Sequence, residues 1–146
     1  MKEVTSTEKV VFAAFVMTTI IYLHRIATKN PALMENRVFI TLIFVTALTV
    51  VAALLQIDTL GNIAHTLYGA ILLYVLADQG DRDILLLCVV LSLMTVAVNV
   101  MFKRCSWAAI FNYTTDYGDK TELIVRDTGV LAGALLVKYL MLKKGN

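Results

Sequence analysis

Two neighbouring hydrophobic segments of the chain carry polar residues at the spacing of one helix face. In the segment 60–77, Asn62, His65 and Gly69 recur at intervals of three and four residues. Residues at these intervals lie on the same side of an α-helix. Because a histidine side chain titrates near neutral pH, His65 could bind and release a proton. The spacing predicts a polar helix face that contains one titratable group.

The next hydrophobic segment, 84–102, has a matching set of small polar residues. Cys88, Ser92, Thr95 and Asn99 follow the same helical spacing. Gly80 lies in the polar loop between the segments and predicts a turn that folds them into an antiparallel hairpin. The expected pairs at equal depth are Asn62 with Asn99, His65 with Thr95 or Val96, and Gly69 with Ser92.

Two interpretations of these faces stay open. In lipid, helices associate through small residues and side-chain hydrogen bonds, so the faces can serve packing. They can also form a polar path for protons, ions or a small ligand along Asn62, His65, Ser92, Thr95 and Asn99. We favour packing, because Ser, Thr and Asn are common at helix contacts. A weaker stripe that includes Thr46 and Thr49 lies in the segment 38–57.

Residue patterns typical of catalysis or metal binding are missing from the sequence. There is no nucleophile elbow, P-loop, dinucleotide-binding glycine motif, HExxH or CxxC. His65 has no second histidine or carboxylate at metal-ligand spacing, so we expect no metal and no cofactor. Lys103 and Arg104 could lower the pKa of the Cys105 thiol, but no base for it is evident. The sequence predicts a protein that is not an enzyme.

The composition is that of a protein whose solvent is lipid. The 146 residues are 59% hydrophobic and 16% charged, and the mean hydropathy is +0.77. An ordinary soluble domain has about 45–50% apolar and about 25% charged residues. The net charge of +2 is too small to indicate nucleic-acid binding. We therefore expect one all-α domain over residues 1–146, built as a polytopic membrane helix bundle.

Five apolar segments predict five transmembrane helices. The expected ranges are about 6–28, a second helix that starts near Pro31 and ends at 57, then 60–77, 84–102 and 119–143. If the first segment lay on the membrane surface, four spans would remain. Capping residues are expected at Thr5 with Glu8, at Asp58 or Thr59, and at Asp81. Lys and Arg are evenly shared between the two sides of a five-span bundle, so orientation stays open.

Aromatic residues gather in a more polar segment at about 105–120. Trp and Tyr prefer the headgroup region, so Trp107, Tyr113 and Tyr117 are predicted to anchor an interfacial segment with a short helix at 106–112.

The last helix combines charges with a motif of small residues. Gly129 and Gly133 form a GxxxG motif, which permits close approach of two backbones, and we favour an internal contact over a dimer seam. Arg126 and Asp127 suit a solvated or headgroup position. Lys138 is close enough to the end for its stem to reach the membrane surface.

These features favour a structural or assembly protein over other classes. The expected role is a non-catalytic subunit of a larger membrane complex or of a membrane-containing particle such as a virion. The alternative is a small oligomeric channel or carrier that uses the polar path above. The expected partners are the lipid bilayer and other membrane or peripheral protein subunits, with a homo-oligomer open. The membrane could be that of a cell, an organelle or a virion.

Overall fold

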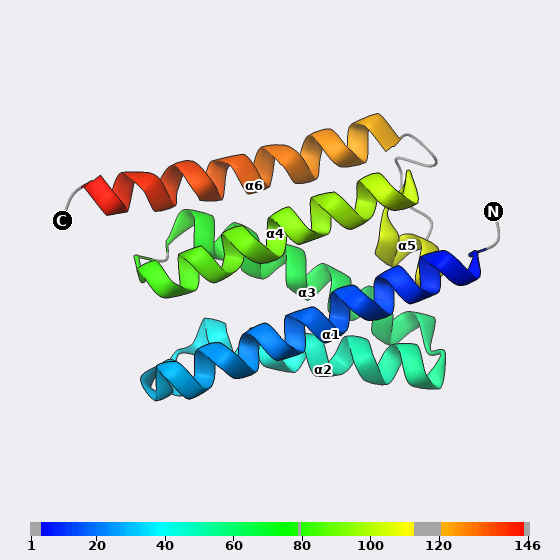
Figure 1. Ribbon diagram of the computed structural model, residues 1–146, viewed down its shortest axis with the longest axis horizontal. Coiled ribbons are helices and arrows are strands. Elements are labelled where there is room, and N and C mark those ends of the chain that lie inside the picture. The colour runs from blue at the N-terminus through cyan, green and yellow to red at the C-terminus, as the bar shows by residue number, and fades with distance from the viewer. Residues whose placement is uncertain (1–3, 79, 113–120, 145–146) are drawn as a thin grey trace.

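The computed structural model describes residues 4–78, 80–112 and 121–144, and these ranges form a bundle of α-helices (Figure 1). The elements in chain order are α1 (Ser6–Lys29), a 3-10 helix η1 (Pro31–Glu35), α2 (Arg37–Leu55), α3 (Asp58–Ala77), α4 (Arg82–Phe102), α5 (Ser106–Ile110) and α6 (Thr121–Lys144). The predicted all-α fold is confirmed. The Cα traces of the long helices run side by side, and α4 is the most buried of the first four long helices.

Local signals in the sequence set where α1 and α4 begin. The Thr5 hydroxyl accepts from the Glu8 backbone N–H, and the Glu8 carboxylate accepts from the Thr5 N–H, as in a capping box. The Asp81 side chain accepts from the N–H groups of Asp83 and Ile84 at the start of α4. Both predicted caps are confirmed.

The starts of α2 and α3 differ from the sequence prediction. Pro31 opens the separate 3-10 helix η1, and α2 begins only after Asn36. The Asn36 side chain accepts from two backbone N–H groups of the first turn of α2, which makes it the better start signal. The predicted cap at Asp58 or Thr59 is wrong, because Ile57 is the N-cap of α3 and makes no side-chain cap bond.

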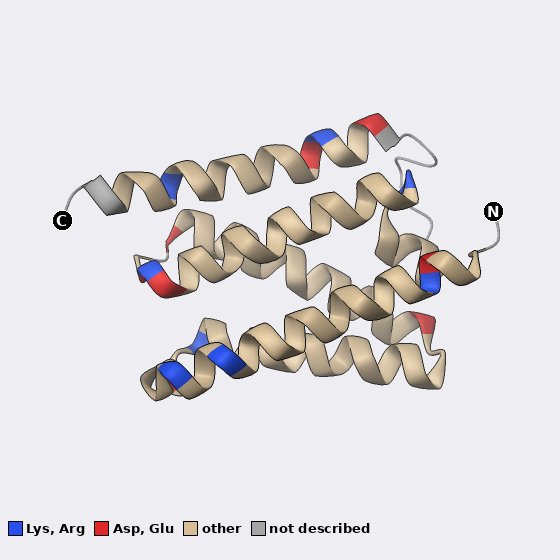
Figure 2. Cartoon of the chain, viewed as in Figure 1, with Lys and Arg blue, Asp and Glu red and all other residues tan. Residues whose placement is uncertain are grey.

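Within the described ranges, four helices are long and apolar enough to cross a membrane: α1, α2, α3 and α4. Their charged residues gather toward the ends of the bundle, and their central stretches carry none (Figure 2). Large apolar side chains are exposed along these central stretches, among them Met17, Phe44, Leu73 and Leu93. Lipid is the medium that such surfaces require. The chain is therefore an integral membrane protein with a helical bundle.

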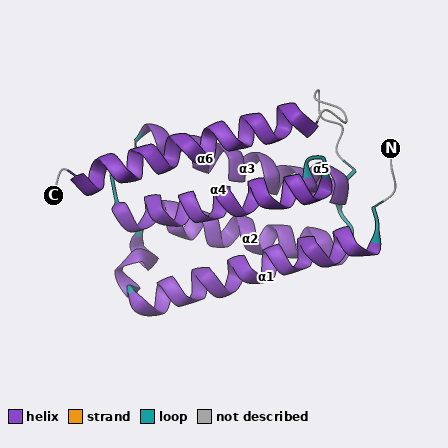
Figure 3. Ribbon diagram, turned by 45° about the horizontal axis from the view of Figure 1, so that its top comes forward, coloured by secondary structure: helices purple, strands orange, loops and turns teal. Residues whose placement is uncertain are grey.

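Among the long helices described, α6 and not α1 is too polar to count as a membrane span. It has 24 residues, but Arg126, Asp127 and Lys138 interrupt its apolar run. The four-span alternative assumed that the first segment would leave the membrane, whereas α1 is one of the four apolar helices. α6 lies along α4 in the opposite direction and makes its most extensive contacts there (Figures 1 and 3).

Lys138 attaches α6 to the end of α3. Its ammonium group donates to the carbonyl oxygens of Val75 at 2.8 Å and Leu76 at 2.9 Å. The last carbonyls of a helix have no partner within the helix and carry the negative end of its dipole. The Lys138 charge therefore serves a contact between helices, where the sequence had suggested a side chain that extends to the membrane surface.

Replacing Lys138 by methionine is expected to loosen α6 from the bundle. Loss of hydrogen bonds to a charged donor costs about 1.5–3 kcal/mol, and methionine keeps the apolar stem. Protease susceptibility of α6 in mild detergent should rise, together with a lower denaturation midpoint. Lys9→Met on the exposed face of α1 is the matched control. Equal effects of the two substitutions would show that the Lys138 contact does not hold α6.

Candidate functional site

The predicted polar faces of α3 and α4 do meet, but through a different residue of α3. The Tyr68 hydroxyl lies 3.1 Å from the Thr95 hydroxyl, and both side chains are buried. Thr95 donates its own proton to the Leu91 carbonyl at 2.9 Å, so Tyr68 is the donor in this bond. Tyr68, not His65, is therefore the hydrogen-bond partner of Thr95 on α3.

Asn99 holds the short helix α5 in place. Its side-chain oxygen accepts from both the backbone N–H and the hydroxyl of Ser106, each at 2.9 Å. Asn99 is 2% exposed and Ser106 is fully buried. The Asn99 oxygen is thus directed to the first residue of α5, and no described hydrogen bond joins it to Asn62.

Ser92, Asn62 and Gly69 make no described side-chain hydrogen bond between α3 and α4. The buried Ser92 hydroxyl donates to the Val89 carbonyl of its own helix at 2.9 Å. Asn62 is half-buried. A Cβ built at Gly69 would have no neighbour within 4 Å, so α3 and α4 make no close backbone approach there.

Trp107 lies inside the bundle rather than at its surface. Its ring is 5% exposed and stacks on the rings of His65 and Tyr68 of α3, at centroid distances of 5.5 and 5.4 Å. The edges of Phe12 and Phe15 of α1 complete the surroundings at 5.4 Å each. The predicted headgroup anchor is therefore a core residue that joins α1, α3 and α5. Tyr113 and Tyr117 lie outside the described residues.

His65 and Cys105 bring a histidine and a cysteine side chain together at the start of α5. The distance from the Cys105 Sγ to the His65 Nε2 is 4.0 Å. Burial raises the pKa of the Cys105 thiol, and the smaller effect of the backbone N–H groups of Ala108 and Trp107 opposes it. The expected lowering by Lys103 and Arg104 is therefore wrong, because removal from water dominates. Within the described ranges, no three His, Cys, Asp or Glu residues lie close enough to hold a metal.

A raised pKa keeps the Cys105 thiol protonated at neutral pH, and only the thiolate attacks an alkylating reagent. In a Cys88→Ala protein, maleimide labelling of Cys105 should be slow at pH 7 and should accelerate as the pH rises above the usual range for cysteine. After denaturation the labelling should be fast at pH 7. Equal rates in the folded and denatured protein at pH 7 would contradict the buried, protonated thiol.

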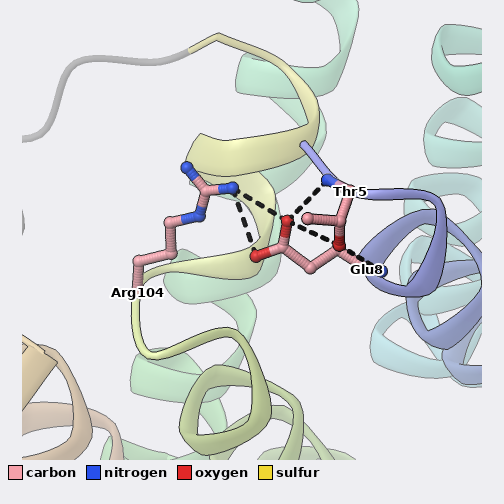
Figure 4. Close-up of polar contacts among 3 residues, drawn as sticks. All are labelled: Thr5, Glu8 and Arg104. Atoms are coloured by element: carbon pink, nitrogen blue, oxygen red, sulfur yellow. Dashed lines mark hydrogen bonds and ion pairs between the residues drawn. The ribbon is translucent and has the colours of Figure 1, made fainter. Parts of the chain in front are cut away.

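An ion pair between Arg104 and Glu8 lies at the same end of the bundle (Figure 4). Arg104 donates from one nitrogen to both oxygens of the Glu8 carboxylate, at 3.0 and 3.2 Å. One of these oxygens also accepts from the backbone and hydroxyl of Thr5. The pair joins the start of α1 to the loop between α4 and α5. The sequence analysis missed it, because the two residues are far apart in the chain.

Glycine permits one close contact at this end, at Gly61. A Cβ built at Gly61 would overlap the ring of Phe111, which is itself buried. At Gly129 and Gly133 an added Cβ would meet nothing within 4 Å among the described residues, and Gly133 is exposed. The favoured internal contact at the GxxxG motif has no counterpart among the described residues, and the alternative of a dimer seam stays a prediction.

Comparisons with known proteins gave no match to a family model, to a curated protein or to a solved structure. The class of the protein therefore rests on its own sequence and fold, which define a helical integral membrane protein.

Proposed function

We propose that the chain is a non-catalytic structural or assembly subunit of a larger membrane complex or of a membrane-containing particle. The observation that supports this role most strongly is how the polar side chains inside the bundle are used. Asn99, Thr95 and Lys138 each hydrogen-bond to another helix of the same chain. Side chains committed to such bonds serve packing, which is the purpose that interhelical hydrogen bonds have in lipid.

The nucleophile–base geometry also favours a non-catalytic role. The Cys105 thiol is buried and protonated, and its 4.0 Å separation from His65 is at the limit of a hydrogen bond to sulfur. A working cysteine nucleophile needs a thiolate that its substrate can reach.

The native mass after gentle detergent extraction tests the proposal. A subunit should elute in a complex of fixed stoichiometry with larger membrane or peripheral proteins. A homo-oligomer without any partner would contradict the subunit role and would favour the oligomeric channel or carrier.

His65→Leu separates these two functions. A subunit should show altered assembly or no change, since His65 contributes packing against Trp107. A flux or pH response that is lost in this variant while assembly is kept would contradict the structural role.

A further inference from the structure

A small, partly open cavity lies among the first five α-helices at mid-depth of the bundle. It offers about 20 Å³ to the centre of a water-sized sphere, and a cavity needs about 10–15 Å³ on this measure to hold one water molecule. Half of its lining residues are Phe, Val and Leu. Its polar lining residues are Thr19, Thr46, Thr49, Tyr68 and Trp107.

The three threonines of the cavity offer acceptors. Thr19, Thr46 and Thr49 donate their hydroxyl protons to carbonyls of their own helices, at 2.9, 2.8 and 2.8 Å. A hydroxyl has one proton and two lone pairs, so each oxygen can still accept a hydrogen bond.

The Tyr68 hydroxyl can likewise only accept a further hydrogen bond, because it donates its proton to Thr95. The hydroxyls around the cavity therefore have acceptor capacity left and no proton left to donate. An occupant that satisfies them must itself donate hydrogen bonds.

Trp107 supplies the complementary group. Its indole N–H is buried and has no hydrogen-bond partner among the described residues, and the whole side chain is 5% exposed. Indole nitrogen is a donor only, and a buried donor without an acceptor is costly. The occupant must therefore accept one hydrogen bond from Trp107.

We propose that the cavity is a binding site for an internal water molecule, which accepts from the Trp107 indole and donates to the threonine or tyrosine oxygens. Water is the smallest molecule that both accepts and donates, and the cavity volume fits one. Such a water joins α5 to α1, α2 or α3 through hydrogen bonds. Buried waters of this kind make about three bonds to otherwise unsatisfied groups.

The test uses Trp107 as the only tryptophan in the chain. In ¹⁵N-labelled protein in lipid nanodiscs, its indole N–H gives a single resonance. We expect a direct cross-peak between this proton and a long-lived water, and an ultraviolet Raman band typical of a hydrogen-bonded indole. The contrary result is an indole proton resonance that is shifted upfield and has no water cross-peak. It would show that the N–H is directed at the Phe12 or Phe15 ring, and it would overturn the proposal.

Threonine substitutions locate the acceptors of the water. Thr19→Val with Thr49→Val removes two acceptors at nearly constant shape, and the cross-peak should be lost or strongly weakened. Thr18→Val is the matched control, because Thr18 makes the same bond to its own helix at 2.8 Å but lies on the exposed face of α1. An unchanged cross-peak in the double variant would overturn the assignment of these hydroxyls. If the double variant does not fold, the wild-type spectrum decides alone.

Discussion

Replacing Asn99 by leucine is expected to detach α5 and to destabilise the bundle more than any other single polar substitution in α3 or α4. Leucine leaves the backbone N–H and the hydroxyl of Ser106 buried without their acceptor. Each stranded group costs about 1–3 kcal/mol. Trp107 lies in the first turn of α5, so its fluorescence should report the loss of order directly. Denaturation by SDS from mild detergent, followed by fluorescence, measures the change.

Asn62→Leu is the matched control for this substitution. It removes the same side chain from the same end of the bundle, but Asn62 is half-buried and its side chain makes no described hydrogen bond. We expect a change within about 0.5 kcal/mol. If Asn62→Leu destabilised the protein as much as Asn99→Leu, the attachment of α5 by Asn99 would be refuted.

A second large effect is expected from Gly61→Ala, because the added methyl group would occupy the place of the Phe111 ring. Overpacking of a well-filled core costs about 1–3 kcal/mol. The ring is 1% exposed, so it belongs to the buried core. Thermal unfolding in mild detergent should show a lower midpoint for this variant.

Gly69→Ala on the same helix separates the clash from the change in helix propensity. Alanine is favoured over glycine in a helix by about 1 kcal/mol, and an added Cβ at Gly69 meets nothing within 4 Å. This variant should be as stable as the wild type or more stable. Phe111→Leu should partly rescue Gly61→Ala; additive losses in the double variant would exclude a clash between the two residues.

Two helix starts were predictable because a short polar side chain and its backbone partners are close in sequence. The capping box of Thr5 with Glu8 and the cap at Asp81 are such cases. Pro31 misled the prediction for α2, because proline suits the first turn of a 3-10 helix as well as that of an α-helix. Only the structure shows that Asn36 supplies the cap.

The partners of the polar faces were less predictable than the faces themselves. Helical periodicity tells which residues share a side, but it does not tell which neighbouring element that side meets. Asn99 lies on the predicted face and bonds to α5, which follows it in the chain. Tyr68 was missed because tyrosine counts as a hydrophobic residue when polar helix faces are sought in the sequence. Its hydroxyl nevertheless makes the hydrogen bond to Thr95.

The contacts of charged side chains with residues far away in the chain could not be predicted from the sequence. Lys138 was expected near the membrane surface on its position alone, yet its bonds are with the end of α3. Glu8 and Arg104 meet only because the start of α1 and the loop after α4 lie at the same end of the bundle. Such contacts depend on the packing order of the helices, which periodicity does not determine.

The central claim is that the polar side chains within α3 and α4 serve packing and do not line a path. Ser92 tests it most directly, because it is 3% exposed at mid-depth of α4 and cysteine is close to serine in size. Ser92→Cys would be made in a protein in which Cys88 and Cys105 are replaced by alanine. Native membranes that contain this variant would be treated with a membrane-impermeant maleimide. Thr7→Cys, at the exposed start of α1, would be treated in the same way for comparison. We predict labelling at position 7 but none at position 92 until the protein is denatured. Rapid labelling at position 92 in the native membrane would reveal a water-filled path and contradict the account.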